Sequence, residues 1–248
     1  MKFDKQVRRV ARWLASADHI LVFSGSGFSA ESGVPTFRGT GGLYDDPDIL
    51  RYAHRDALEE EPEEALAWIE GLRGRLTGYE PNPGHRALAR ICRDHACTIA
   101  TQNIDGLLED AFEDEGLSTD CIWHIHGTLK EARCLDCNEP AEVPDDYTQA
   151  RCDKCGGYLR PNVVLFGEML PEEPFARAQE AARKADVVLL LGTSGIVHPA
   201  AALPGLARSH GAKLVEINPN ETELSDICDV VIRGKTGEVL PEVLEAMG

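Results

Sequence analysis

The chain has 248 residues, and its 42 acidic and 25 basic residues give a net charge of −17. A surface of this sign argues against nucleic acid as a direct ligand, and no apolar run reaches the roughly 20 residues of a membrane span. The basic start of the chain lacks an uninterrupted apolar core, so we expect no secretory signal and predict a cytoplasmic protein. The acid-rich, lysine-poor composition fits either a very salty cytoplasm, which screens self-repulsion, or simply an acidic protein.

The length suits one large α/β domain, alone or with a small inserted module, and it allows a substantial core without disulfides. Eight cysteines without a secretory signal indicate metal ligands or free thiols instead. Residues 1–17 predict an amphipathic helix whose apolar face holds Val7, Val10, Ala11 and Leu14. The sequence carries no indication of oligomeric state.

A predicted buried strand, His19–Phe23, leads into a turn with the sequence Gly-Ser-Gly-Phe-Ser-Ala at residues 25–30. A strand, a G-x-G-x-x-A turn and a helix start together are the dinucleotide-binding fingerprint. Glycine lets the backbone turn tightly and approach a diphosphate, and the N–H groups of the helix start supply the anion site. The same turn also occurs in α/β cores without a ligand, so the motif alone leaves both interpretations open.

The stretch after this turn does not suit an ordinary dehydrogenase. The predicted helix is cut short at Gly33–Pro35, and a loop with an aromatic and a basic residue, Phe37 and Arg38, follows. A dehydrogenase would place an acidic residue about 20 positions on, after a second strand. Here the aspartates at 45, 46 and 48 follow no strand, and the next predicted strand is Cys97–Thr101. A long insertion therefore separates the first two strands.

The strand Cys97–Thr101 is followed at once by the polar segment Gln102-Asn103-Ile104-Asp105. Ligands of open α/β sheets bind at the carboxyl ends of the strands, so Asn103 and Asp105 are candidates for a binding site. The competing interpretation is that these residues only cap the next predicted helix, Gly106–Phe112.

The next predicted strand, Cys121–Ile125, carries two histidines near its end, His124 and His126, before Gly127. Imidazole titrates near neutrality, so either histidine could be a general base, and either could equally be an ordinary hydrogen-bonded residue. Strand alternation puts both side chains on the same face. Geometry at this level therefore does not choose between them.

Two C-x-x-C pairs follow, Cys134 with Cys137 and Cys152 with Cys155, and 14 residues separate the pairs. Four thiolates fill the tetrahedral shell of Zn²⁺, so we predict a structural zinc site with no open position for a substrate. A redox function would need only one C-x-x-C pair. Residues 128–160 include seven acidic and five basic residues, which argues against a ribbon that binds nucleic acid.

Two further strands end in small or polar residues, which suit contacts with phosphate or ribose. Asp186–Leu191 is followed by Gly192-Thr193-Ser194, and Lys213–Ile217 is followed by Asn218-Pro219-Asn220. The remaining predicted elements are helices at Asp56–Leu76, at His85–Asp94, at Pro199–His210 and after residues 234–237, with strands within Arg160–Glu168 and at Asp229–Ile232. Residues predicted to be small core side chains, because they lack ligand spacing, are Cys92, Cys97, Cys121 and Cys228.

These motifs, in this order, resemble those of the sirtuins, the NAD-dependent protein deacylases. Gly25–Arg38 is similar to the family's Gly-Ala-Gly-Ile-Ser and Gly-Ile-Pro-x-Phe-Arg, residues 101–105 to its Thr-Gln-Asn-Ile-Asp, and residues 160–168 to a third motif. The resemblance covers nearly the whole chain. Ser26 and Phe28 replace the usual alanine and isoleucine beside the diphosphate turn, which bears on NAD affinity, and Thr36 stands where many deacetylases have aspartate.

The resemblance implies an α/β fold with a doubly wound, parallel, Rossmann-like sheet and a small inserted module containing a four-cysteine zinc ribbon. We expect residues 1–38, 82–127 and 166–248 to form the NAD-binding domain. Residues 39–81 would be a helical insertion that belongs to the small domain, and residues 128–165 would be its zinc-ribbon part. NAD and an acyl-lysine would meet between the two domains.

By resemblance, His126 is the catalytic base, because the sirtuin catalytic histidine directly precedes a glycine. Asn103 and Asp105 would line the pocket for nicotinamide and its ribose. Val164 and Phe166 would contact the acyl-lysine of a protein or peptide that adds as a β-strand, although a plain core strand explains them equally well. The residues expected to bind NAD are Gly25, Ser26, Gly27, Phe28, Ser29, Thr36, Phe37, Arg38, Gln102, Asn103, Ile104, Asp105, Gly192, Thr193, Ser194, Asn218, Pro219, Asn220 and Thr236.

The implied reaction transfers the acyl group of a protein lysine to ADP-ribose, with consumption of NAD and release of nicotinamide. We favour deacetylation, because the helix before residue 77 lacks the Tyr-x-x-Arg pair of desuccinylating members, although Trp68, Arg73 and Arg75 are nearby. Gly39 and Thr40 leave room for a longer acyl chain, so larger acyl groups stay open. Mono-ADP-ribosyl transfer on the same fold also stays open, and the less favoured functions are an NAD(P)-dependent oxidoreductase and a non-catalytic zinc-ribbon binding protein.

Overall fold

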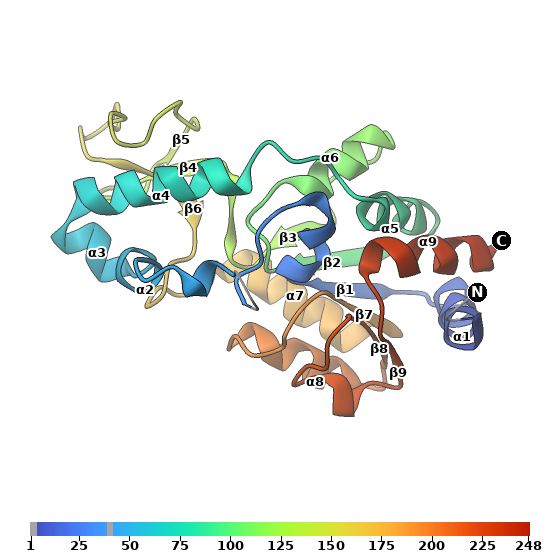
Figure 1. The fold of residues 1–248 in the computed structure, drawn as a ribbon. Helices are drawn as coiled ribbons and strands as arrows, with labels where there is room; N and C mark the ends of the chain where they lie inside the picture. The colour runs from blue at the N-terminus through green and yellow to red at the C-terminus, as the bar shows by residue number, and fades with distance from the viewer. Residues whose placement is uncertain (1–3, 39–41) are drawn as a thin grey trace.

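A computed structural model describes residues 4–38 and 42–248 of the chain (Figure 1). Its centre is a six-stranded sheet in the order β3-β2-β1-β7-β8-β9, in which neighbouring strands are parallel. The strands are β1 Ile20–Ser24, β2 Cys97–Thr101, β3 Ile122–His124, β7 Val187–Leu191, β8 Lys213–Ile217 and β9 Val230–Ile232. The strand order reverses between β1 and β7, as in a doubly wound sheet, and confirms the predicted fold class.

Helices cover both faces of this sheet. The helices on one face are α1 Asp4–Ala15, α5 Pro83–Asp94, α6 Leu107–Asp114 and α9 Thr236–Met247, and those on the other are α7 Glu172–Lys184 and α8 Leu203–Ser209. Strands β1 and β7 are buried at every residue, which explains their continuous aliphatic sequences. The predicted apolar face of α1 is buried, and α1 lies beside α9 near the two chain ends (Figure 1).

A smaller module lies at the other end of the molecule and has its own hydrophobic cluster (Figure 1). Its elements are the antiparallel strands β4 Gly127–Cys134, β5 Pro140–Ala141 and β6 Leu159–Val163, and the helices α2 Ile49–Tyr52, α3 Arg55–Glu60 and α4 Pro62–Leu76. The prediction of one helix over Asp56–Leu76 is therefore wrong. Pro62 has no N–H with which to continue α3, and it instead opens α4 in the first turn, where proline is well tolerated.

The turn after β1 also differs from the predicted helix start. Two 3₁₀ turns, Ser26–Phe28 and Ala30–Ser32, follow the strand, and Gly33 ends the second with a φ of 97°. Another 3₁₀ turn, Ala200–Ala202, replaces the beginning of the helix predicted from Pro199. Within residues 4–38 and 42–248, no helix has both the length and the apolar character to cross a membrane.

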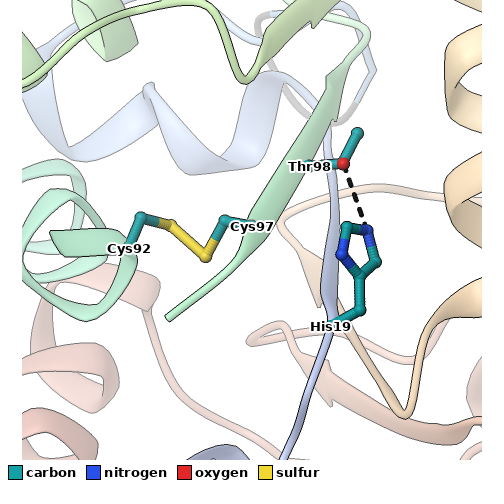
Figure 2. Close-up of a disulfide and its surroundings, with 4 residues drawn as sticks. All are labelled: His19, Cys92, Cys97 and Thr98. Atoms are coloured by element: carbon teal, nitrogen blue, oxygen red, sulfur yellow. Dashed lines mark hydrogen bonds between the residues drawn. A yellow bond between two sulfur atoms is a disulfide. The ribbon is translucent and has the colours of Figure 1, made fainter. Parts of the chain in front are cut away.

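A disulfide joins Cys92 at the end of α5 to Cys97 at the start of β2, with 5.5 Å between the Cα atoms (Figure 2). The expectation of metal ligands or free thiols without disulfides is therefore wrong for this pair. The short connection from α5 to β2 places the two side chains together, which sequence spacing alone does not reveal. On the other side of β2, Thr98 contacts His19 at 3.2 Å between Oγ1 and Nε2.

The turns that follow β1 and β7 touch backbone to backbone at the carboxyl edge of the sheet. The Gly25 N–H donates to the Leu191 carbonyl at 3.0 Å, and the Gly27 N–H donates to the Gly192 carbonyl at 2.9 Å. A Cβ atom on Gly27 would lie 2.7 Å from the Gly192 oxygen, and Gly192 itself has a φ of 57°. The glycines are therefore required by this contact whether or not a ligand is bound.

We predict that Gly192→Ala destabilises the protein by roughly 2–5 kcal/mol, because alanine is strained at this φ and its Cβ would collide with the Gly27–Phe28 backbone. Gly205→Ala is the matched control, since a Cβ in the middle of α8 meets open space and should stabilise the protein by about 0.5–1 kcal/mol. Chemical denaturation of both variants measures the effect. Equal stability of the two would contradict the argument.

Candidate active site

A cavity of about 840 Å³ lies between the carboxyl ends of the sheet strands and the small module. Segments that follow four different strands, β1, β2, β7 and β8, meet in its wall. The predicted site residues that line it are Gly25, Ser26, Gly27, Thr36, Phe37, Arg38, Gln102, Asn103, Ile104, His126, Val164, Phe166, Gly192, Thr193, Ser194, Asn218, Pro219, Asn220 and Thr236. The parallel topology therefore gathers motifs that are far apart in sequence.

Three predicted residues, Phe28, Ser29 and Asp105, are buried behind this wall. The Phe28 ring packs on His85, with 4.2 Å between the ring centroids. The Ser29 hydroxyl accepts a hydrogen bond from Asn103 Nδ2 at 3.0 Å, and an Asp105 carboxylate oxygen accepts from the first N–H of α6 at 3.2 Å. Asp105 thus contacts the start of α6 without being its N-cap residue, which is Gly106, whereas the Asn103 side chain is held at the cavity.

The Asp105 carboxyl group is almost completely enclosed. Burial raises its pKa, while hydrogen bonds from Ser29 and from the backbone of Leu107 act in the opposite direction. These partners fix the carboxylate beneath the segment that includes Asn103. Asp105 therefore supports the cavity wall from behind.

Gln102 connects three strands at the floor of the cavity. Its side-chain Nε2 donates to the Ser24 carbonyl at 3.1 Å and to the Thr193 hydroxyl at 2.8 Å, and its backbone N–H donates to the same Ser24 carbonyl at 3.0 Å. Below it, the buried Ser24 hydroxyl donates to Thr101 Oγ1 at 2.9 Å. Hydrogen bonds therefore connect the ends of β1, β2 and β7 beneath the cavity.

His126 lies in the cavity wall, and its Nδ1 is 3.3 Å from the Gln102 carbonyl. Burial lowers the pKa of His126, and the hydrogen bond to this carbonyl offsets only part of the effect. The lowered pKa favours the neutral form of the ring. Because a carbonyl can only accept, Nδ1 carries the proton, and Nε2 keeps the lone pair that a general base needs.

His124 has different surroundings and is not among the described residues that line the cavity. Its Nδ1 donates to the Asn103 carbonyl at 2.8 Å, and its Nε2 forms an ion pair with Glu109 of α6. Burial alone would lower the pKa of His124, but the hydrogen bond and charge of Glu109 outweigh it and raise the pKa. The structure thus separates the two histidines that the strand pattern could not.

Three neighbouring aromatic side chains, Phe37, Tyr44 and Phe166, line the cavity. The Phe37 and Tyr44 ring centroids are 5.9 Å apart, and those of Tyr44 and Phe166 are 6.0 Å apart. The Arg38 guanidinium lies over the Tyr44 ring at 4.7 Å. Sequence reasoning missed Tyr44, because the loop around it has no periodic pattern.

Helix α4 supplies an apolar wall to the cavity. Its apolar stripe, Ala65, Ile69, Leu72 and Leu76, is by spacing alone more typical of a core than of a functional groove. Trp68, Ile69 and Leu72 line the cavity, while Ala65 and Leu76 of the same stripe are buried in the small-module cluster. The stripe therefore has both roles. Its spacing of three and four residues was the available signal, but periodicity does not distinguish a core from a cavity wall.

Polar contacts between loops build the part of the cavity wall that follows β7 and β8. Asn218 Nδ2 donates to the Thr193 carbonyl at 3.1 Å, and the Asn220 N–H donates to Asn218 Oδ1 at 3.0 Å. Glu31 accepts hydrogen bonds from the Gly237 N–H at 2.8 Å and from the Thr236 hydroxyl at 3.3 Å, which ties α9 to the turn after β1. Glu31 also lines the cavity, and the sequence analysis did not identify it.

The four predicted zinc ligands form one cluster in the small module. All four sulfur atoms lie within 4.8 Å of one another, with 3.5 Å between Cys134 and Cys155 and 3.7 Å between Cys137 and Cys152. Tetrahedral zinc with bonds of about 2.3 Å requires sulfur atoms about 3.8 Å apart. The cluster fits Zn²⁺, and four sulfurs leave no coordination position for a substrate.

Known proteins resemble this chain over nearly its whole length. The profile of the Sir2 family matches residues 25–199. A Pyrobaculum aerophilum protein named NAD-dependent protein deacylase 2 is 41% identical over 95% of this chain and 94% of that protein. An ADP-ribose complex of a Sir2 homologue superposes with a TM-score of 0.89, 37% identity and coverage of 96% and 95%. Sir2Af2 bound to a myristoylated histone peptide gives a TM-score of 0.76, 33% identity and coverage of 98% and 97%.

We predict that Cys137→Ser removes zinc and disorders the small module, because three thiolates no longer complete the tetrahedral shell. Cys228→Ser is the matched control, since this thiol is outside the cluster and donates a hydrogen bond to the Leu224 carbonyl, which a serine hydroxyl can also do. Zinc content by atomic emission should fall from about one per chain to near zero in the first variant only. Full zinc content in Cys137→Ser would contradict the assignment.

Proposed function

The chain belongs to the Sir2 family, and from this premise we propose that it is an NAD-dependent protein lysine deacylase in which His126 is the general base. The observation that carries the assignment of roles is that His126 lies in the wall of a cavity that also contains the glycine turn after β1, with its Nδ1 at the Gln102 carbonyl. The substrates would be proteins or peptides that carry acyl-lysine. A cytoplasmic location, and the absence of nucleic acid and membrane ligands, stay part of this proposal.

The chemistry of the cavity wall fits NAD. Glycine backbone at residues 25 and 27 suits a diphosphate, Arg38 and Lys235 supply positive charge, and the side chains of Asn103 and Asn218 supply amide groups for ribose or nicotinamide. Bound NAD would supply an activated ribose that accepts the acyl group as nicotinamide leaves. The predicted NAD residues Phe28, Ser29 and Asp105 would act from behind the wall, by holding the turn and Asn103 in place.

In this proposal His126 Nε2 takes a proton from a ribose hydroxyl group. Its Nδ1 hydrogen bond to the Gln102 carbonyl fixes the tautomer and the orientation of the ring. Phe37 and its aromatic neighbours exclude water from the reacting face. Asn103, held by Ser29, would position the nicotinamide end of the cofactor.

The acyl-lysine would enter along the segment that follows β6. The Val164 N–H donates to the His126 carbonyl at 2.8 Å, so the acyl site and the base are connected through one backbone hydrogen bond. The carboxylate of Glu168 accepts from the Leu165 N–H at 2.8 Å and pairs with the buried Arg160, which fixes the same segment. We propose Val164 and Phe166 as the residues that contact the substrate.

The α4 wall favours uncharged acyl groups. Arg73 pairs with Glu70 and donates to the Pro144 carbonyl at 3.0 Å, and Arg75 pairs with Asp46, so neither is available to a succinyl carboxylate. Gly39 and Thr40, which were expected to leave room for a longer chain, lie outside the described residues. We propose deacetylation as the main activity and aliphatic acyl groups as a second substrate class, since Sir2Af2 is a relative bound to a myristoylated peptide.

The predicted division into domains is supported by the three hydrophobic clusters. Two of them cover the faces of the large sheet, and the third unites the helical insertion with the zinc ribbon. The boundary between residues 38 and 39 lies beside residues 39–41, outside the described part of the chain. A plain oxidoreductase would have no use for the four-cysteine zinc cluster, and a zinc-ribbon binding protein would have no use for a histidine in the wall of this cavity.

We predict that His126→Ala lowers deacylation of an acetyl-lysine peptide by roughly 10²–10⁴-fold without unfolding the protein, because a general base contributes about this much. In the unaltered protein, the acidic limb of the activity profile should follow the lowered pKa of His126, since the base must be neutral. Mass spectrometry of the peptide with and without NAD measures the rate. His210→Ala, at an exposed position, is the control, and equal rates for both variants would exclude the assignment.

We predict that a succinyl-lysine peptide reacts at least about tenfold more slowly than an acetyl-lysine peptide, because its carboxylate would be desolvated against Ile69 and Leu72 without a partner. Leu72→Arg should narrow this difference by supplying a cation, whereas Leu72→Met should leave it unchanged. Competition between the two peptides in one reaction measures the ratio of their deacylation rates. Fast desuccinylation by the unaltered protein would contradict this account of the acyl site.

A further inference from the structure

The ion pair between His124 and Glu109 lies under the cavity wall and has no place in the mechanism above. The side chains of His124 and Glu109 are 11% and 16% exposed, and neither is among the described residues that line the cavity. The pair joins β3, at the edge of the large sheet, to α6. Desolvation of both charges is costly, so a buried ion pair of this kind suggests a role other than stability alone.

The contacts of His124 point to Asn103. The His124 Nδ1–H donates to the Asn103 carbonyl at 2.8 Å, while its Nε2–H donates to the Glu109 carboxylate. Two acceptors require a proton on both ring nitrogens, so the ring is an imidazolium. Asn103 is held at two further points, through its N–H to Thr101 Oγ1 at 3.1 Å and through Nδ2 to Ser29 Oγ at 3.0 Å.

We propose that the His124–Glu109 ion pair positions Asn103 in the active-site wall, so that turnover requires a proton on both ring nitrogens of His124. This inference rests on the proposed deacylase function, in which Asn103 holds the nicotinamide end of NAD. A neutral His124 has one N–H for two buried acceptors. Either the Asn103 carbonyl or the Glu109 carboxylate then faces a lone pair, and the Asn103 segment loses its support. His124 is thus a positioning residue.

The charged groups around the pair agree with this arrangement. Asp105, on the segment after β2, faces His124 and favours its protonated form, and Glu109 does so more strongly. Lys130 of β4 faces Glu109 and helps to keep it ionised. His85 of α5 is near Glu109 as well, but burial lowers the pKa of His85 to about 3, so it adds no charge.

The sign of the pH dependence follows from the raised pKa of His124. The doubly protonated His124 ring holds both the Asn103 carbonyl and Glu109 below the ordinary histidine pKa. This support is lost as the pH rises through the raised pKa of His124. His126 limits activity on the acidic side, because its pKa is lowered. The two histidines should therefore give a bell-shaped profile of kcat/KM for NAD, with His124 responsible for the alkaline limb.

The test compares Glu109→Gln with Asp110→Asn. Glu109→Gln removes the buried carboxylate and should move the alkaline limb to lower pH by about one unit or more. Asp110→Asn removes the same charge at the next residue, where Asp110 forms an exposed ion pair with Lys130, and should leave the limb unchanged. His124→Gln keeps one donor for Asn103 without a titrating ring and should abolish the limb. An alkaline limb unaffected by Glu109→Gln and His124→Gln would overturn the proposal.

A measurement on the unaltered protein keeps the proposal testable if a variant fails to fold. In ¹⁵N-histidine NMR, His124 should carry protons on both nitrogens at pH 7 and should titrate above an ordinary histidine. Titration at or below the ordinary value would overturn the inference. Absence of any NAD-dependent deacylation would instead count against the proposed function, and the NMR result for His124 would stand independently of it.

Discussion

The close approach of two turns at the carboxyl edge of the sheet is the constraint on which the active site depends. Gly27 and Gly192 meet backbone to backbone, and Gln102 crosses between the ends of β1, β2 and β7 with hydrogen bonds to Ser24 and Thr193. These contacts fix the ends of these strands relative to one another before any ligand binds. A preorganised wall of this kind is what allows polar groups from distant motifs to act together.

Two histidines two residues apart illustrate how surroundings assign different chemistry to the same side chain. His126 faces the cavity with a carbonyl on one nitrogen, and burial leaves it neutral with a free lone pair. His124 pairs with the Glu109 carboxylate behind the wall, which raises its pKa and favours its protonated form. His126 can accept a proton, and in our proposal His124 instead supports Asn103. An acid–base site needs both a base with a suitable pKa and residues that hold the base and the substrate in place.

The small module contributes the apolar part of the cavity wall. Its four-cysteine cluster and hydrophobic core hold β4 and α4 in place, and α4 in turn presents Ile69 and Leu72 to the cavity. The polar end of the cavity is built on the large sheet. In the proposed function, the nucleotide would therefore bind to the large sheet and the acyl chain to the wall formed by the small module.

The sequence by itself determined the features that depend on local pattern. Continuous aliphatic runs predicted the buried strands, glycine spacing predicted a tight turn after β1, and cysteine spacing predicted the zinc ligands, because each of these features depends on residue types and their spacing. The 3₁₀ turns that replace the predicted helix start after β1 did not follow from that spacing. Only the tertiary structure decided the features that depend on neighbours from elsewhere in the chain. The Cys92–Cys97 disulfide, the burial of Phe28 behind the wall, the second role of the α4 stripe and the separate roles of His124 and His126 all belong to this group. A side chain's protonation and accessibility are set by what packs against it, and that packing is not encoded in the spacing of residues along the chain.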